Sequence, residues 1–199
     1  MEKQRKPRVL LTGFTPFGGE RINPALETVN RVRCPEAELR ILEVPTVFGD
    51  SARLVTAEMD AFRPDVVLCV GQAAGRSAVT PERVAINVDD ARIPDNNQPV
   101  DAPIVPGGPA AYFATAPVKD MVRAIREAGV PSELSNSAGT YVCNHLLYQV
   151  LHHAAPGVRA GFIHVPCIPE QTEGTDRPSL PLAQLVTALE AAVSACCKG

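Results

Sequence analysis

Short apolar runs alternate with amphipathic segments along the whole chain. The apolar runs predict five strands, at residues 9–12, 39–44, 65–70, 84–88 and 160–165. The run at 65–70 (DVVLCV) is continuous and is followed by Gly71, which is typical of a parallel strand buried on both faces. This segment is therefore expected at the centre of a sheet.

The segments between these runs carry apolar residues at helical spacing. They predict helices that include residues 55–62, 118–125 and 182–193. Asn23-Pro24 is typical of a helix start, with Asn as the cap and Pro at the first helical position, and predicts a helix to about Val32. A further helix is predicted from about Val142 to His152, and a long loop at 89–109.

Alternation of strands and helices favours an α/β fold: a mostly parallel sheet with helices on both faces. We find no internal repeat and no break in composition, so one domain is expected over residues 1–199. In such sheets, ligands bind outside the carboxyl ends of the strands. Each candidate residue is therefore judged by whether it falls at such an end.

Composition narrows the possible partners. The net charge of −3 offers no basic surface of the kind that phosphate backbones attract, so no nucleic acid partner is expected. The start of the chain lacks the apolar run of a signal peptide, and no stretch of about 20 apolar residues is present. We therefore expect a cytoplasmic protein without a membrane partner.

The cysteines and histidines do not form a metal motif. The chain has six cysteines and no C-x-x-C pair, and in a cytoplasmic protein they are expected to stay reduced. The histidines at 145, 152 and 153 do not match H-E-x-x-H. No metal site is predicted.

Cys143 lies at the start of a predicted helix, in SNSAGTYVCNHLL. Unpaired N–H groups and the helix dipole favour an anion at that position, so a thiolate would be stabilised there and available as a nucleophile. The alternative is a small packed core residue, because Cys143 shares a helix face with Leu147 and Val150. The other five cysteines are interpreted as core or incidental thiols.

His164 closes the apolar strand in AGFIHVP and so falls at a strand's carboxyl end. A histidine there can reach a nucleophile on a neighbouring helix and act as its base. A core histidine with satisfied hydrogen bonds is the alternative interpretation.

Glu82 lies in TPERVAINV, where strand alternation puts it in phase with Val84, Ile86 and Val88 on an inward face. A buried carboxylate must be paired. It can orient a catalytic imidazole, or it can form an ion pair with Arg83 or Arg92. The same inward carboxylate serves either interpretation.

Two glycine-rich turns follow predicted strands. GFTPFGG does not match the dinucleotide fingerprint G-x-G-x-x-G and contains Phe14 and Phe17 instead, which suggests an apolar pocket wall. GQAAGR, after the strand at 65–70, offers backbone N–H groups to a substrate. Simple turn chemistry is the alternative for both.

Five motifs occur in this order: TGFTPFGGERINP, VGQAAGRSAVTPERVAIN, DDARIPDN, SNSAGTYVCNH and GFIHVPCIPEQ. Together they closely resemble the pyroglutamyl peptidase I (pyrrolidone-carboxylate peptidase) family of cysteine peptidases, over residues 9–171. Two positions depart from that family's usual pattern: Ala74 stands where glycine is expected, and Ser137 where threonine is usual. The resemblance implies a phosphorylase/hydrolase-like α/β/α sandwich, in agreement with the pattern above.

The resemblance also implies roles. Cys143 would be the nucleophile, His164 the general base and then acid, and Glu82 the orienting carboxylate, with Arg92 beside the thiol to aid the oxyanion. The implied substrate-binding residues are Phe14, Phe17, Gln72, Tyr141 and Val142. The implied reaction is removal of N-terminal pyroglutamate from peptides through a thioester, without cofactor or metal. A homo-oligomer, commonly a tetramer, is expected.

Two other functions fit the same fold. A nucleoside phosphorylase-like enzyme would need a phosphate site and a ribose-binding acid, and would have no use for the thiol. A non-catalytic α/β binding domain would keep the core but would not need Cys143, His164 and Glu82 together.

Overall fold

A computed structural model of the protein describes residues 5–91 and 100–198. Its central sheet has five strands in the order β2-β1-β3-β7-β4. Their bounds are β1 Arg8–Phe14, β2 Glu38–Val44, β3 Val66–Gln72, β4 Thr80–Pro81 and β7 Arg159–Val165. The first four strands in that order are parallel and β4 is antiparallel to β7. The predicted mostly parallel sheet is confirmed.

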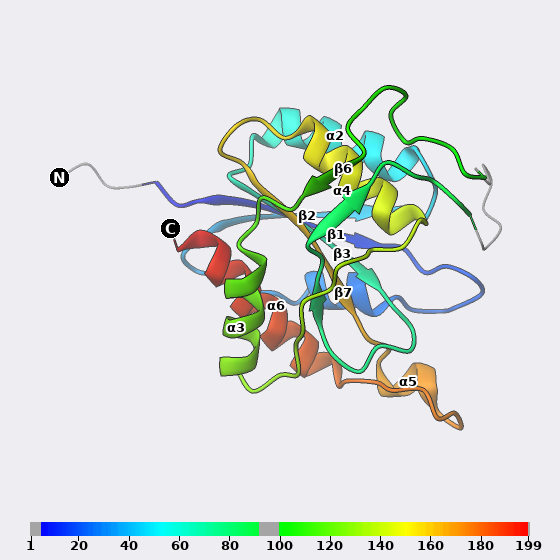
Figure 1. The fold of residues 1–199 in the computed structure, drawn as a ribbon. Coiled ribbons are helices and arrows are strands. Elements are labelled where there is room, and N and C mark those ends of the chain that lie inside the picture. Colours follow the sequence, from blue (N-terminus) through cyan, green and yellow to red (C-terminus); the bar gives the residue numbers. More distant parts are fainter. Residues whose placement is uncertain (1–4, 92–99, 199) are drawn as a thin grey trace.

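Helices cover both faces of this sheet, as Figure 1 shows. Side chains of the central strand β3 alternate between two cores: Leu68 packs with one group of helices and Val67 with the other. The first group is α1 Pro24–Val29, α3 Val118–Glu127 and α6 Leu182–Cys197. The second is α2 Asp50–Phe62 and α4 Val142–His153. The molecule is therefore the expected three-layer sandwich.

Helix α1 begins as the sequence predicts, because the Asn23 side chain accepts a hydrogen bond from Ala25 N and Pro24 occupies the first helical position. It ends at Val29 rather than about Val32. The short helix α5, Pro169–Thr172, was not expected from the sequence.

The strand predicted at 84–88 does not join the central sheet. It forms β5, Val84–Ile86, which pairs with β6, Ala111–Phe113, in a separate antiparallel sheet of two strands. Neither β6 nor the two-residue strand β4 was predicted. Both are too short to leave a hydrophobic pattern, and both are held by partners distant in the chain.

The order of the strands places the site. The connection from β1 through α1 leads to β2, on one side of β1, and the next connection through α2 leads back to β3, on the other side. At such a reversal the loops diverge, and a crevice opens at the carboxyl ends of the two strands. The turns that follow β1 and β3 therefore border this crevice. In the described part of the chain, no helix is long and apolar enough to cross a membrane.

Candidate active site

Cys143 is the second residue of α4, and no side chain caps that helix. Backbone N–H groups in the first turn of the helix therefore point toward the end where the thiol lies. The thiol sits over Gly71 of β3: a methyl group added to Gly71 would lie 3.1 Å from Sγ. Cys143 is half-buried and lines a cavity, so it is not a fully packed core residue.

The stabilised thiolate expected at this helix start does not describe the free protein. Burial raises the pKa of the Cys143 thiol to about 12, Glu82 adds to the rise, and Arg76 opposes it. The loss of hydration disfavours the charged form more than the helix terminus favours it. The thiol is protonated at neutral pH and needs a nearby base to become a nucleophile.

His164 is the next-to-last residue of β7 and is 4% exposed. In the sheet it lies beside Gly71, the residue beneath the thiol, and its ring is tilted by 50° against that of Phe162, with 4.8 Å between the ring centroids. Its Nδ1 lies 2.7 Å from Oε1 of Glu82. The structure therefore brings the thiol, the imidazole and the carboxylate to one end of the sheet.

Glu82 is fully buried, as predicted, but not for the predicted reason. Within β5 the buried side chain is Ala85, and Ile86 is 36% exposed, so the strand's inward phase does not include Glu82. Glu82 instead lies between β4 and β5, where its N–H donates to the carbonyl of Phe162. Pairing with β7 and with the segment around Ser135 turns its side chain inward.

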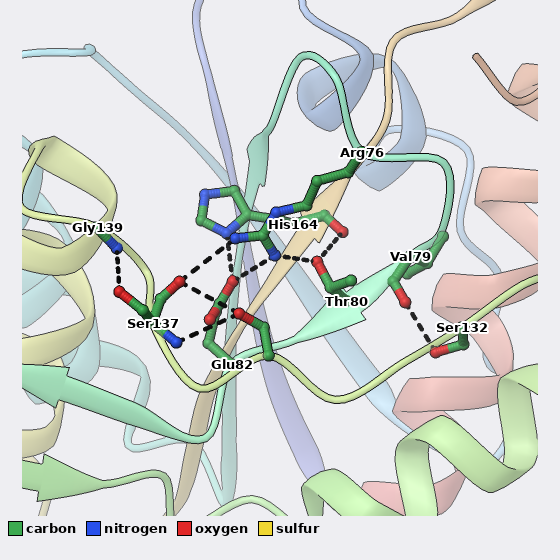
Figure 2. Close-up of polar contacts among 9 residues, drawn as sticks. Arg76, Val79, Thr80, Glu82, Ser132, Ser137, Gly139 and His164 are labelled. Carbon is green, nitrogen blue, oxygen red and sulfur yellow. Dashed lines mark hydrogen bonds and ion pairs between the residues drawn. The ribbon is translucent and has the colours of Figure 1, made fainter. Parts of the chain in front are cut away.

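Among the described residues, the cation that contacts Glu82 is Arg76 and not the adjacent Arg83. Nη1 of Arg76 lies 2.8 Å from Oε1 of Glu82, so this oxygen accepts from both Arg76 and His164 (Figure 2). Arg92 lies outside the described residues. The sequence places Arg76 at the end of the turn GQAAGR, but no local pattern shows that this turn brings the guanidinium to Glu82.

The environment keeps the pair as carboxylate and neutral imidazole. Burial alone would raise the pKa of Glu82, but the hydrogen bond and charge of His164, with Ser135 and Arg76, hold it below its usual value. Burial lowers the pKa of His164 more than Glu82 raises it, and Arg76 lowers it further. An ionised carboxylate only accepts hydrogen bonds, so Nδ1 of His164 carries the proton and Nε2 is the basic nitrogen.

A cavity of about 440 Å³ adjoins the thiol. Four of the sequence-predicted residues line it: Phe14, Phe17, Gln72 and Tyr141, together with Cys143. Pairing between β1 and β3 ends at Val70, whereas β3 continues to Gln72. The edge of Gln72 that faces β1 is therefore not paired with that strand. Thr46 and Asn23, which the sequence did not suggest, also line the cavity.

Val142 is placed differently from the other predicted pocket residues. Its side chain is fully buried in the core between α4 and the sheet. As the first residue of α4, it can offer a backbone N–H to a ligand but not its side chain.

A second carboxylate–histidine pair lies apart from the thiol. Nδ1 of His145 is 2.7 Å from Oδ2 of Asp89, and both residues are buried. Nε2 of His145 accepts a hydrogen bond from Gly49 N at 3.3 Å, so this imidazole has partners on both nitrogens. His145 thus links α4 to Asp89 and to Gly49, the N-cap of α2, and its ring has no free nitrogen for proton transfer.

Two cavities of similar size lie elsewhere, about 520 Å³ beside Asp65 and Cys197 and about 540 Å³ beside Asp60 and His153. One is lined by Cys197 without a histidine and the other by His153 without a cysteine. The thiol that lines the 440 Å³ cavity, by contrast, lies over Gly71, the sheet neighbour of His164. Within residues 5–91 and 100–198, no cluster of three or more histidine, cysteine or acidic residues suits a metal ion. The chemistry of the side chains therefore selects the cavity at Cys143.

Comparison with known proteins gives a family match over almost the whole chain. The family model described as "Pyroglutamyl peptidase" matches residues 7–199. The pyrrolidone-carboxylate peptidase of Levilactobacillus brevis is 56% identical over 196 residues, which cover 94% of this chain and 96% of that protein. The enzyme of the same name from Streptococcus pyogenes is 51% identical, over 94% of this chain and 91% of that one.

Solved structures of the same family also match this chain. The crystal structure of pyroglutamyl peptidase I from Bacillus amyloliquefaciens superposes with a TM-score of 0.93 at 45% identity, covering 98% of this chain and 97% of that one. A mutant pyrrolidone carboxyl peptidase from Pyrococcus furiosus gives a TM-score of 0.89 at 40% identity, covering 95% and 97%. The likeness extends over nearly the whole sandwich.

Proposed function

The chain belongs to the pyroglutamyl peptidase family of cysteine peptidases, and on that basis we propose that Cys143 is its nucleophile, His164 its general base and acid, and Glu82 the carboxylate that orients the base. Its activity is removal of an N-terminal pyroglutamyl residue from peptides. Membership of this family decides between the peptidase and the two alternatives, a nucleoside phosphorylase-like enzyme and a non-catalytic domain. The observation that carries the proposed roles is the 2.7 Å contact between Glu82 Oε1 and His164 Nδ1.

The first half of the reaction follows from the protonation states at the site. Nε2 of the neutral His164 takes the proton of the Cys143 thiol as Sγ attacks the acyl carbon of the pyroglutamyl–Xaa amide. The oxygen of that carbonyl becomes an anion, and backbone N–H groups at the start of α4, where no side chain caps the helix, stabilise it. His164 then returns the proton to the leaving amine, the C–N bond breaks, and a thioester on Cys143 remains.

The second half regenerates the free thiol. Nε2 of His164, neutral again, takes a proton from water as the water oxygen attacks the thioester carbon. The C–S bond breaks, pyroglutamate leaves, and the proton passes to Sγ. In both halves Glu82 holds the ring through Nδ1 and balances the transient imidazolium charge.

Specificity for the ring is proposed to come from the cavity walls. Phe14 and Phe17 supply apolar surface, and the rings of Phe17 and Tyr141 lie 5.9 Å apart. A flat neutral lactam can pack against such apolar walls, and the backbone around Gln72 can pair with its N–H and C=O. Amino-terminal residues with a charged amine would leave these groups unpaired.

Thiol alkylation tests the proposed nucleophile. Cys143 and Cys197 are the two cysteines that are not fully buried, so iodoacetamide can reach either. We expect hydrolysis of a pyroglutamyl-linked chromogenic amide to be lost as Cys143 is labelled, and free pyroglutamate to protect Cys143 but not Cys197. Full turnover by protein labelled at Cys143, located by peptide mapping, would exclude it as the nucleophile.

Three further features remain proposals of the same kind. We propose that residues 1–199 fold as one domain, that the protein works in the cytoplasm, and that it forms a homo-oligomer, with four copies the expected number. A single cooperative melting transition would support the single domain. Light scattering of the purified protein gives the number of copies, and a monomer at micromolar concentration would contradict the homo-oligomer.

A further inference from the structure

The side chain of Arg76 connects three segments that meet at the proposed active site (Figure 2). Its Nη1 contacts Oε1 of Glu82 at 2.8 Å and also hydrogen-bonds the hydroxyl of Thr80. Its Nη2 lies 3.4 Å from the carbonyl oxygen of Ser137. Thr80 is the residue of β4 that pairs with His164, and Ser137 lies in the segment leading to α4 and its thiol.

Local structure aims Arg76 at this place. The chain turns sharply after β3 at Gly75, whose φ of +94° is a conformation that favours glycine. The turn is closed by a hydrogen bond from Arg76 N to the carbonyl of Ala73. The same turn carries Gln72 and Ala74, which line the substrate cavity. Arg76 therefore joins the cavity wall to the carboxylate.

We propose that Arg76 is a positioning residue for this reaction: its guanidinium fixes the Glu82 carboxylate against His164 and ties both to the segment that carries Cys143. The inference rests on the proposed roles of those three residues. It adds a fourth side chain, which acts through Glu82 and does not touch the reacting atoms.

The carboxylate depends on this contact. Oε1 of Glu82 has two partners, Arg76 and His164, whereas Oε2 is buried and has no hydrogen-bond partner among the described residues. Removing Arg76 leaves this buried carboxylate, among the described residues, with the imidazole and the smaller contribution of Ser135. A charge with so few partners is disfavoured, and the side chain would rotate or gain a proton.

Arg76 also contributes its charge. Among the described residues, the charged groups that act on His164 are Glu82, from the β4–β5 connection, and Arg76, from the β3–β4 turn. The cation of Arg76 lowers the pKa of both Glu82 and His164. It thereby favours the neutral base and ionised acid that the reaction needs.

Arg76→Gln removes the charge but keeps a polar side chain, and Arg76→Lys keeps the charge but loses the planar fork. For Arg76→Gln we expect kcat per folded molecule to fall on the order of 10-fold or more with little change in KM, as for other residues that orient a reacting group. The acid limb of kcat/KM should move to higher pH, because His164 loses a neighbouring cation. For Arg76→Lys, kcat should fall less and the acid limb should stay in place.

Arg83→Gln is the matched control, because it removes one positive charge from the residue next to Glu82 in the chain and should leave the acid limb where it is. A wild-type kcat and acid limb in Arg76→Gln would overturn the positioning role, whatever its melting temperature. If Arg76→Gln does not fold, wild-type kcat in Arg76→Lys would overturn it instead. Cys143→Ala in the same assay distinguishes failure of the proposed function from failure of this inference. Turnover by Cys143→Ala would contradict the proposed nucleophile. An inactive Cys143→Ala, together with Arg76 variants that behave like the wild type, would contradict the role of Arg76 alone.

Discussion

Gly71 lies directly beneath the thiol of Cys143: a methyl group on it would come within 3.1 Å of Sγ and 2.7 Å of the Phe162 ring. Gly71 is also the sheet neighbour of His164. A single backbone position without a side chain thus sets the space between the proposed nucleophile and the proposed base.

Gly71→Ala should therefore lower kcat strongly, because the added methyl displaces the thiol or the ring of Phe162. It should also destabilise the fold by about 1–3 kcal/mol, the usual cost of overpacking. Gly161→Ala is a matched control: its methyl would crowd Ala116 at 3.0 Å, on the opposite side of the sheet. We expect Gly161→Ala to lower the melting temperature yet keep kcat per folded molecule. Equal kcat losses in the two variants would contradict the account.

Glu82→Gln keeps the shape of the side chain but removes its charge. We expect kcat to fall while KM changes little, because the imidazolium form of His164 loses its counter-charge. The loss should be smaller than for Cys143→Ala, because the nucleophile and the backbone donors remain. Measured kcat per folded molecule, alongside a melting curve, tests this.

Asp89→Asn offers the control for Glu82→Gln. Asp89 is another buried carboxylate 2.7 Å from a histidine, but that histidine has both nitrogens occupied. Asp89→Asn should therefore lower stability and retain most of kcat. Near-wild-type kcat in a destabilised Glu82→Gln would show that Glu82 is also only a structural residue.

The sequence predicted the frame of the fold well, since its strongest signals are local. The continuous apolar run at 65–70 became the central strand β3, and the Asn23-Pro24 cap begins α1. Glu82 was correctly expected to be buried, but from a strand phase that does not exist there. Its orientation comes from pairing with Phe162 and Ser135, both more than 50 positions away, and such contacts leave no local pattern.

The ion pair of Glu82 was out of reach of the sequence for the same reason. Arg83 and Arg92 were the expected partners, and of these Arg92 lies outside the described residues. The contact is made by Arg76, which only the turn at Gly75 brings back toward the carboxylate. Distances between side chains depend on turns of this kind, and periodicity does not report them.

The buried thiols predict how stability depends on alkaline pH. The pKa values of Cys34, Cys69, Cys143 and Cys196 are each raised to about 12, mainly by burial. The unfolded chain releases these protons near pH 9, while the folded protein keeps them. Stability is therefore full below pH 9 and is lost as pH rises from there toward 12.

Urea unfolding at a series of pH values from 8 to 11 measures this slope. Cys69→Ala removes one fully buried thiol and should make the slope shallower, by at most about 1.4 kcal/mol per pH unit. An unfolding free energy that is flat across this range in the wild-type protein would show that the thiols ionise in the folded state.

The aromatic wall predicts substrate selectivity. Phe17 is half-buried at the mouth of the cavity and packs near Tyr141. Phe17→Ala should raise KM for a pyroglutamyl amide more than it lowers kcat, and peptides that begin with proline or glutamate should be poor substrates. Phe113→Ala, which truncates a phenylalanine that is 71% exposed on β6, is the control and should leave both constants unchanged. Similar kcat/KM for prolyl and pyroglutamyl amides would contradict a pocket built for the lactam.

The most direct test of the proposed site is turnover by Cys143→Ala, measured per folded molecule with a pyroglutamyl-linked chromogenic amide. Cys197→Ala, which removes the other partly exposed thiol, is the control. We predict no turnover above background in a Cys143→Ala protein whose circular dichroism matches the wild type, and unchanged turnover in Cys197→Ala. Substantial turnover by folded Cys143→Ala would contradict the assignment of this thiol as the nucleophile.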